Sequence, residues 1–311
     1  MEYFHRIAVV WLSIGGLRAR AGLAMLATII AVGSLAAVPA AAQRYERGLL
    51  WRIEGGAAQA SHVFGTIHLA DKRVAQLPPA VSSALQEARS LSIEVGFDPA
   101  SLVALAGRMI FQDERDLPGV AGPELYQKAV TLTARLGLPE PALRRFRPWA
   151  IALLLSAPPQ DPAGVLDVVL AGAARAQGKP VHELESMEEQ VAVFEGLPDA
   201  DQVVLLRQAV EGYERLPGTI SRVIEAYLAG DLAGMSRISD EMPGADANAK
   251  RLHAVVNRRL LDERNVRMAE RLQARLKEGG ALVAIGALHL YGEKGVLAEL
   301  AKRGWRVTRV Y

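Results

Sequence analysis

The chain has 311 residues, of which 50% are apolar and 23% charged, and this is the composition of a folded globular protein. Its formal net charge of +2 excludes the strongly basic surface with which proteins attract nucleic acid. The sequence contains no cysteine, which excludes disulfides, thiolate metal sites and cysteine nucleophiles. Any transition-metal site must therefore use histidine, carboxylate or water ligands.

The N-terminal segment is typical of exported proteins. Arg18 and Arg20 precede an apolar run over residues 21–38, which ends in small residues up to Ala42. This order predicts a secretory signal peptide over residues 1–42, cleaved after Ala42, and a periplasmic or envelope-associated mature protein. The residues before Arg18 are also apolar, so an uncleaved membrane anchor is the alternative. No later segment has the roughly 18–20 apolar residues that a membrane span needs.

The first part of the mature chain alternates strand and helix signals. The apolar runs Leu49–Ile53 and His62–Leu69 predict two strands. A helix over Pro79–Ala88, with proline in its first turn, is then expected to lead into a buried strand over Leu91–Val95. A strand–helix–strand order is typical of a parallel sheet.

The middle of the chain is mostly helical, apart from a strand signal over residues 179–184. The expected helices cover residues 99–109, 123–136, 166–176, 187–194, 200–214, 219–229 and 250–277. The C-terminal part returns to a strand over Ala281–Leu290, a helix over Gly295–Lys302 and a strand over Trp305–Val310. The predicted fold is α/β, a central mixed, largely parallel sheet built from both chain ends. Residues 43–311 form one domain, with helical insertions at about 99–178 and 187–278.

One short sequence pattern occurs at the ends of two predicted strands. Phe64-Gly65-Thr66-Ile67-His68-Leu69 matches Ile285-Gly286-Ala287-Leu288-His289-Leu290 as apolar, glycine, small, aliphatic, histidine, leucine. Strand side chains alternate between faces, so each histidine would share a face with a small residue that leaves room for an ion. The glycines Gly65 and Gly286 permit another backbone to approach closely. A single such histidine is usually structural, but two matched copies favour one shared metal site.

Two histidines need additional ligands to complete a divalent metal site. Glu94 is the best candidate, because it lies in an otherwise apolar strand end where an unpaired carboxylate would be costly. The alternative for Glu94 is a salt bridge to a helix arginine. Glu185, at the exit of the strand over residues 179–184, is a weaker candidate of the same kind.

The long helix over residues 250–277 carries two polar residues on its apolar face. Arg264 and Asn265 fall on the stripe formed by Leu261, Met268, Leu272 and Leu276. The guanidinium of Arg264 needs an anionic partner there, which is Glu94, a substrate carboxylate or a developing oxyanion. A structural clamp on a carboxylate is as well supported as a catalytic role. Other arginines of this helix, Arg267 and Arg271 among them, fit a solvated face.

The ordered motifs of this chain resemble those of the TraB/GumN family, which includes the Tiki proteins and is similar to ChaN-like and erythromycin-esterase-like proteins. The resemblance covers about residues 49–311. The matching segments are Leu50-Trp51-Arg52-Ile53, Gly65-Thr66-Ile67-His68, Ile93-Glu94-Val95, Gly178-Lys179-Pro180-Val181 before Leu184-Glu185, Glu188-Glu189-Gln190, Ala226-Tyr227-Leu228-Ala229-Gly230-Asp231, Glu263-Arg264-Asn265, and Ile285-Gly286-Ala287-Leu288-His289 with Gly292. The resemblance implies an α/β core whose site contains His68, Glu94, Arg264 and His289.

Tiki-type members are described as metal-dependent proteases, so the resemblance implies an exported metal-dependent hydrolase that acts on a peptide or small-molecule substrate. We expect His68 and His289 to bind Mn²⁺, Co²⁺ or Zn²⁺, and Glu94 to be a ligand or the general base. Arg264 would stabilise developing negative charge, and Asn265 would orient Arg264 or the substrate. The alternatives are an envelope protein that holds haem or metal without turnover, and a structural or interaction protein. Oligomeric state has no signal in the sequence.

Overall fold

The computed structural model describes residues 45–96, 99–242 and 246–311. The predicted signal peptide and its cleavage after Ala42 lie outside these residues. In the described part of the chain, none of the helices combines the length and the apolar character that crossing a bilayer requires.

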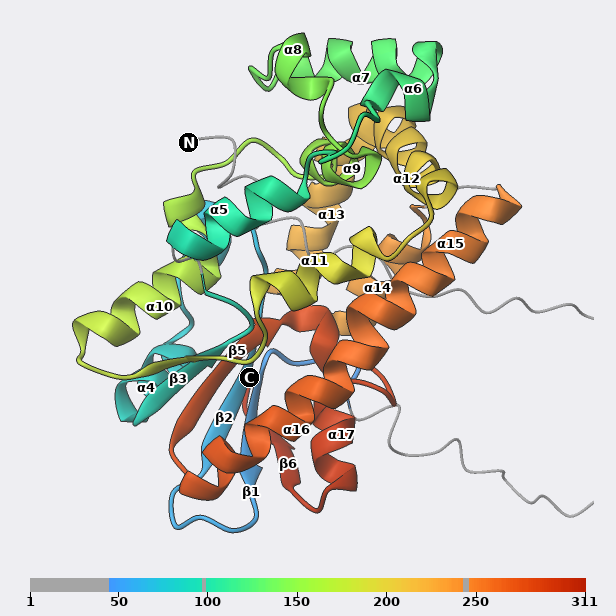
Figure 1. The fold of residues 1–311 in the computed structure, drawn as a ribbon. Helices are drawn as coiled ribbons and strands as arrows, with labels where there is room; N and C mark the ends of the chain where they lie inside the picture. Colours follow the sequence, from blue (N-terminus) through green and yellow to red (C-terminus); the bar gives the residue numbers. More distant parts are fainter. Residues whose placement is uncertain (1–44, 97–98, 243–245) are drawn as a thin grey trace, which may run out of the picture.

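A six-stranded mixed sheet forms the centre of the fold, with strand order β4-β3-β5-β2-β1-β6 (Figure 1). The strands are β1 Leu50–Glu54, β2 Ser61–Thr66, β3 Ser90–Ile93, β4 Val181–Glu183, β5 Ala281–Gly286 and β6 Arg306–Arg309. The four strands from β4 to β2 run parallel, whereas β1 pairs antiparallel with both β2 and β6. The predicted α/β fold with a largely parallel sheet from both chain ends is therefore confirmed.

Helices cover the sheet and extend above it. Figure 1 shows α4 and α10 on one side of the sheet and α16 and α17 on the other. The α-helices are α3 Lys72–Ala75, α4 Pro79–Glu87, α5 Pro99–Arg108, α6 Leu117–Ala121, α7 Pro123–Ala134, α8 Glu140–Leu143, α9 Pro148–Leu155, α10 Leu166–Ala176, α11 Met187–Glu195, α12 Asp199–Gly212, α13 Leu216–Leu228, α14 Leu232–Asp240, α15 Ala247–Asn257, α16 Glu263–Glu278 and α17 Val296–Lys302.

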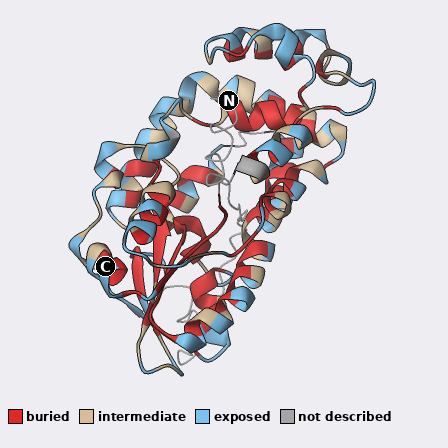
Figure 2. Ribbon diagram, turned by 60° about the vertical axis from the view of Figure 1, so that its left-hand side comes forward, coloured by how far each residue is buried: buried red, intermediate tan, exposed pale blue. Residues whose placement is uncertain are grey.

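The buried apolar side chains form two clusters, which appear red in the sheet and in the upper helices of Figure 2. The first surrounds the sheet and includes side chains from α10, α13, α14 and α16. The second takes side chains from α5 to α9, α11, α12 and α15, and α9 is buried along all eight of its residues. The four parallel strands share one direction, so their carboxyl ends lie at the same edge of the sheet. Ligands of parallel sheets bind beyond that edge.

Two sequence expectations about local structure are wrong. The strand expected over Ala281–Leu290 ends at Gly286, and residues 287–290 form a 3₁₀ turn. The first copy also leaves its strand early, because β2 ends at Thr66. Strand alternation therefore does not set the direction of either histidine. The apolar residues of Gly286-Ala287-Leu288-His289-Leu290 are buried in the turn as they would be in a strand, so burial pattern alone does not distinguish the two.

The long helix expected over residues 250–277 is divided by one π-helical turn. This turn covers Arg258–Asp262, between α15 and α16. A π turn inserts an extra residue into the helical register and is common at functional sites. Here it directly precedes Arg264 and Asn265, which are 0% and 2% exposed. Their predicted position on the apolar face of the helix is confirmed.

Candidate functional site

The two G-x-x-H sequences lie side by side at the carboxyl ends of neighbouring parallel strands. Thr66 at the end of β2 pairs in register with Gly286 at the end of β5. A Cβ atom on Gly65 would lie 2.8 Å from Leu290 Cδ1 and 3.0 Å from Ala287 Cα. A side chain at this position would force Leu290 or the turn to shift, so glycine suits the close packing of the first strand against the 3₁₀ turn that carries the second histidine. The expected close backbone approach is confirmed at Gly65.

His68 is held by a residue that the sequence analysis did not identify. The imidazole Nδ1 of His68 lies 2.6 Å from Oδ2 of Asp167, in the first turn of α10. The hydroxyl of Thr66 donates to Oδ1 of the same carboxylate, also at 2.6 Å. A carboxylate only accepts hydrogen bonds, so Nδ1 of His68 carries the hydrogen and Nε2 is left to face the site.

His289 is oriented in the same way by an amide. Its Nδ1 lies 2.6 Å from Oδ1 of Asn265, whose Nδ2 donates to the carbonyl oxygen of Lys294 at 2.9 Å. A carbonyl can only accept, so this contact fixes which end of the amide faces the imidazole. Nδ1 of His289 therefore carries the hydrogen. Its Nε2 is fully buried and forms no hydrogen bond with any residue that the structure describes.

Glu94 lies beside both free imidazole nitrogens. Its Oε1 is 4.0 Å from Nε2 of His68 and 3.7 Å from Nε2 of His289. The same oxygen accepts from the backbone N–H of Gly286 at 2.5 Å, and Oε2 accepts from Arg264 at 2.6 Å. The structure thus gathers the predicted residues His68, His289 and Glu94 at one point, beyond the ends of β2, β5 and β3.

Electrostatics around Glu94 favour its ionised form. Burial alone raises the pKa of this carboxyl, but His289, Arg264 and His68, together with the Gly286 N–H, hold it well below its usual range. Burial lowers the pKa of His289 to about 4, so this imidazole is neutral at pH 7. Burial also lowers the pKa of His68, but the charge and hydrogen bond of Asp167 outweigh it and raise the net pKa.

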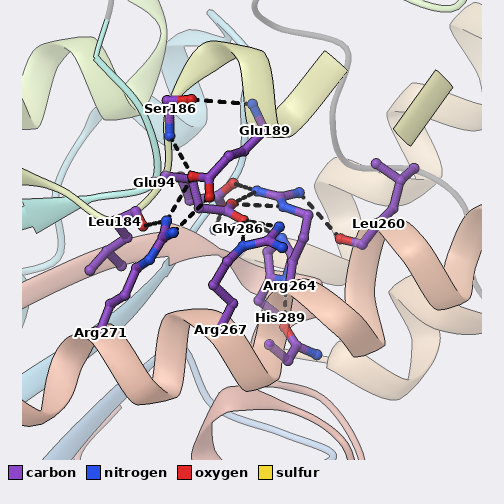
Figure 3. Close-up of polar contacts among 12 residues, drawn as sticks. Glu94, Leu184, Ser186, Glu189, Leu260, Arg264, Arg267, Arg271, Gly286 and His289 are labelled. Carbon is purple, nitrogen blue, oxygen red and sulfur yellow. Dashed lines mark hydrogen bonds and ion pairs between the residues drawn. The ribbon is translucent and has the colours of Figure 1, made fainter. Parts of the chain in front are cut away.

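Arg264 clamps two carboxylates beside the site, as Figure 3 shows. Its guanidinium is 0% exposed and donates to Glu185 at 2.7 Å and to Glu94 at 2.6 Å. It also donates to the carbonyl oxygen of Leu260, in the π turn, at 3.2 Å. Of the two roles considered for Arg264, these contacts are those of the carboxylate clamp.

Two further arginines of α16 are partly exposed, as expected for a solvated face, but each is also paired with a carboxylate. Arg267 donates to Oε1 of Glu185 at 2.7 and 3.0 Å. Arg271 binds the carbonyl oxygen of Leu184 at 2.6 Å and both carboxylate oxygens of Glu189, at 2.6 and 2.7 Å. Arg264, Arg267 and Arg271 follow helical spacing and form one row towards the ends of β3 and β4 (Figure 3).

The three inward-facing atoms suit a cation. The two imidazole Nε2 atoms and Glu94 Oε1 all present lone pairs to the same space, and like partial charges repel unless a cation lies between them. Two ligands bound at about 2.1 Å to a tetrahedral ion lie about 3.4 Å apart. The observed separations of 3.7 and 4.0 Å are a few tenths of an ångström wider. Among the described residues, no group of three or more histidine or carboxylate side chains is arranged closely enough to hold a metal ion as it stands.

Comparison with known proteins places the chain in a family. Residues 49–309 match the TraB/PrgY/gumN family. The chain belongs to that family. It is 29% identical over 245 residues to the uncharacterized protein YbaP of Shigella flexneri, covering 75% of this chain and 84% of the relative. YbaP of Escherichia coli (strain K12) is also 29% identical, with the same two shares.

Animal proteins named as metalloproteases are also relatives of this family member. Metalloprotease TIKI1 of Danio rerio is 27% identical over 297 residues, covering 79% of this chain and 60% of the relative. The Metalloprotease TIKI homolog of Amphimedon queenslandica is 24% identical over 317 residues, covering 85% and 62%. No solved structure matches the chain significantly. The chain is thus distantly related to proteins named metalloproteases.

Proposed function

We propose that this protein is an exported metal-dependent hydrolase that cleaves peptide bonds. The observation that carries the proposal is the position of Glu94 Oε1, which lies 4.0 Å from Nε2 of His68 and 3.7 Å from Nε2 of His289. Both imidazoles are held in the tautomer that offers Nε2 as a ligand, and the buried Nε2 of His289 makes no hydrogen bond within the described part of the chain. The kinship with proteins named metalloproteases supports the same class of activity.

His68 and His289 would hold a divalent ion such as Mn²⁺, Co²⁺ or Zn²⁺, with Glu94 as a third ligand or as general base. A bound ion would supply a Lewis acid that polarises a substrate carbonyl. Glu94 is ionised and faces the space between the imidazoles, so its Oε1 is placed to accept a proton from an attacking water. Arg264 keeps this carboxylate ionised and fixed in position through the 2.6 Å contact to Oε2.

The choice of a peptide as substrate rests on the animal relatives named metalloproteases. A small-molecule substrate is the alternative for the same hydrolytic site. Neither the composition nor the site favours nucleic acid, since the net charge is only +2. Export rests on the N-terminal sequence. It is tested by determining the N-terminus of the protein from the cell envelope, where a start at residue 43 supports cleavage after Ala42 and an intact N-terminus supports the anchor.

The function is tested by metal analysis and peptide hydrolysis on the purified full-length protein. His68→Ala and His289→Ala are compared with His62→Ala, which changes a histidine near the opposite end of strand β2, in register with Leu282. We expect wild type and His62→Ala to retain a stoichiometric divalent ion and metal-dependent hydrolysis, and both site variants to lose them. Bound metal without turnover would support a metal-binding envelope protein. Unchanged metal content in a folded double variant would support a structural role.

A further inference from the structure

The two imidazoles of the site have different partners, although their sequence patterns match. His68 is hydrogen-bonded to the carboxylate of Asp167, and His289 is hydrogen-bonded to the neutral amide of Asn265, both at 2.6 Å. Each partner comes from a helix rather than from the sheet, α10 in one case and α16 in the other. The asymmetry therefore arises from the surrounding helices and not from the repeated G-x-x-H pattern.

Asp167 is itself fixed on both oxygens. Oδ1 accepts from the hydroxyl of Thr66 at 2.6 Å, and Oδ2 accepts from His68 at 2.6 Å, so the carboxylate has one orientation. The residue is 6% exposed, although it is an acidic side chain in an apolar helix. A buried carboxylate is costly unless its oxygens are hydrogen-bonded, and here both are used to hold the end of β2.

The segment before Asp167 holds the backbone of the same histidine. The side-chain amide of Gln160 accepts from the N–H of Ala70 at 2.8 Å and donates to the carbonyl oxygen of His68 at 3.2 Å. Gln160 and Asp167 thus contact His68 from one stretch of chain, through its backbone and its side chain. The position of His68 depends on the connection between α9 and α10 as much as on strand β2.

We propose that Asp167 is a positioning residue that, with Thr66, directs Nε2 of His68 into the site and makes His68 the more strongly donating of the two imidazoles. This inference rests on the proposed metal site. A carboxylate behind a metal-binding histidine fixes the ring and makes its free nitrogen more basic, whereas an amide fixes the ring without adding charge. His68 is then the imidazole that binds an ion more strongly, and His289, whose ring is held by a neutral amide, is the weaker ligand.

The test compares Asp167→Asn, Asp167→Leu and Asn265→Asp with the control Asp199→Asn. Asp199 is the first residue of α12, and its exposed carboxylate is paired with Arg115. Asn at position 167 keeps a hydrogen-bond acceptor but removes the charge, and Leu removes both. Asp at position 265 gives His289 the carboxylate that His68 has in wild type. Two measurements are made on each folded variant, which are the affinity for Mn²⁺ or Zn²⁺ alone by calorimetry and the ¹⁵N NMR signals of the histidine rings without metal.

We expect Asp167→Asn and Asp167→Leu to weaken metal binding by roughly 10- to 100-fold, with Leu the weaker binder. The NMR signals should show His68 with its hydrogen on Nδ1 in wild type and Asp199→Asn, and a mixture of tautomers in Asp167→Leu. Asn265→Asp should shift the ring signals of His289 and not those of His68. An unchanged His68 tautomer in Asp167→Leu, with metal affinity equal to that of Asp199→Asn, would overturn the proposal.

The two proposals fail in different ways. If wild type binds no divalent ion and cleaves no peptide, the proposed hydrolase fails, but the ring signals of His68 without metal still report whether Asp167 sets its tautomer. If wild type binds metal and Asp167→Leu binds it equally well, the hydrolase proposal stands and the role of Asp167 is refuted.

Discussion

The buried contact between Arg264 and Glu94 leads to a sharp prediction about stability. In Arg264→Met, Glu185 keeps its two hydrogen bonds to Arg267, but Glu94 loses its cation while it remains 3% exposed. Removing one partner of a buried ion pair costs about 3–5 kcal/mol, because a charge is left without compensation. At about 2–4 °C per kcal/mol for a domain near this size, the midpoint of thermal unfolding should fall by roughly 6–20 °C.

Arg267→Met is the matched control, because it removes the same kind of side chain from the same helix. The Arg267 side chain is 33% exposed and is hydrogen-bonded to Glu185, which retains Arg264, so its loss should cost about 1 kcal/mol or less. Urea unfolding, followed by circular dichroism, gives the loss in the free energy of unfolding for Arg264→Met and for Arg267→Met. Equal destabilisation by the two substitutions would contradict the assignment of the cost to Glu94.

A second substitution separates the unpaired charge from the loss of packing. Glu94→Gln in the Arg264→Met background removes the uncompensated charge and should recover more than half of the lost stability. The double-mutant cycle should therefore show a coupling energy of about 2 kcal/mol or more, within the range for residues in contact. Free-energy changes that add within about 0.5 kcal/mol would refute the claim that Glu94 needs Arg264 to remain ionised in the core.

Three further predictions concern other parts of the fold. Gly65→Ala should cost about 1–3 kcal/mol in urea unfolding, because its Cβ meets Leu290 at 2.8 Å, and unchanged stability would contradict this packing. Gln160→Leu should speed exchange of the Ala70 amide hydrogen, measured by NMR, and should leave amides of α12 unaffected. Burial raises the pKa of Asp240 to about 7, so its contribution to stability is lost as pH rises through about 7. Asp240→Asn should therefore raise the free energy of unfolding by on the order of 1 kcal/mol at pH 8 and by little at pH 4. Equal changes at the two pH values would refute the raised pKa of Asp240.

The sequence predicts the centre of the candidate site better than its surroundings, and the reason is physical. Glu94 directly follows the apolar strand β3, and Arg264 interrupts the apolar face of a helix, so each is visible as a polar residue where burial is expected. The structure brings these residues together with His68 and His289. Asp167 has no comparable signal, because an acidic residue in the first turn of a helix is common for electrostatic reasons alone. Only its burial reveals that it serves another purpose.

Local register is harder to predict than residue identity. The turn that carries His289 and the π turn before Arg264 each change the direction of a side chain without changing the apolar pattern around it. A sequence pattern reports which residues are buried, but one added residue in a helix or an early strand end alters which neighbours they meet. This explains why the sheet and most helices were predicted, whereas the partners of both histidines were not.

The helices that orient the site also hold the fold together, which couples stability to site geometry. Helix α16 supplies Asn265 to His289 and Arg264 to Glu94, and α10 supplies Asp167 to His68. A displacement of either helix from the sheet would therefore move a histidine partner at the same time as it exposes apolar surface. Matching sequence patterns at two strand ends are not sufficient for such a site. The sheet places the two imidazoles side by side, and the helices determine which nitrogen each one presents.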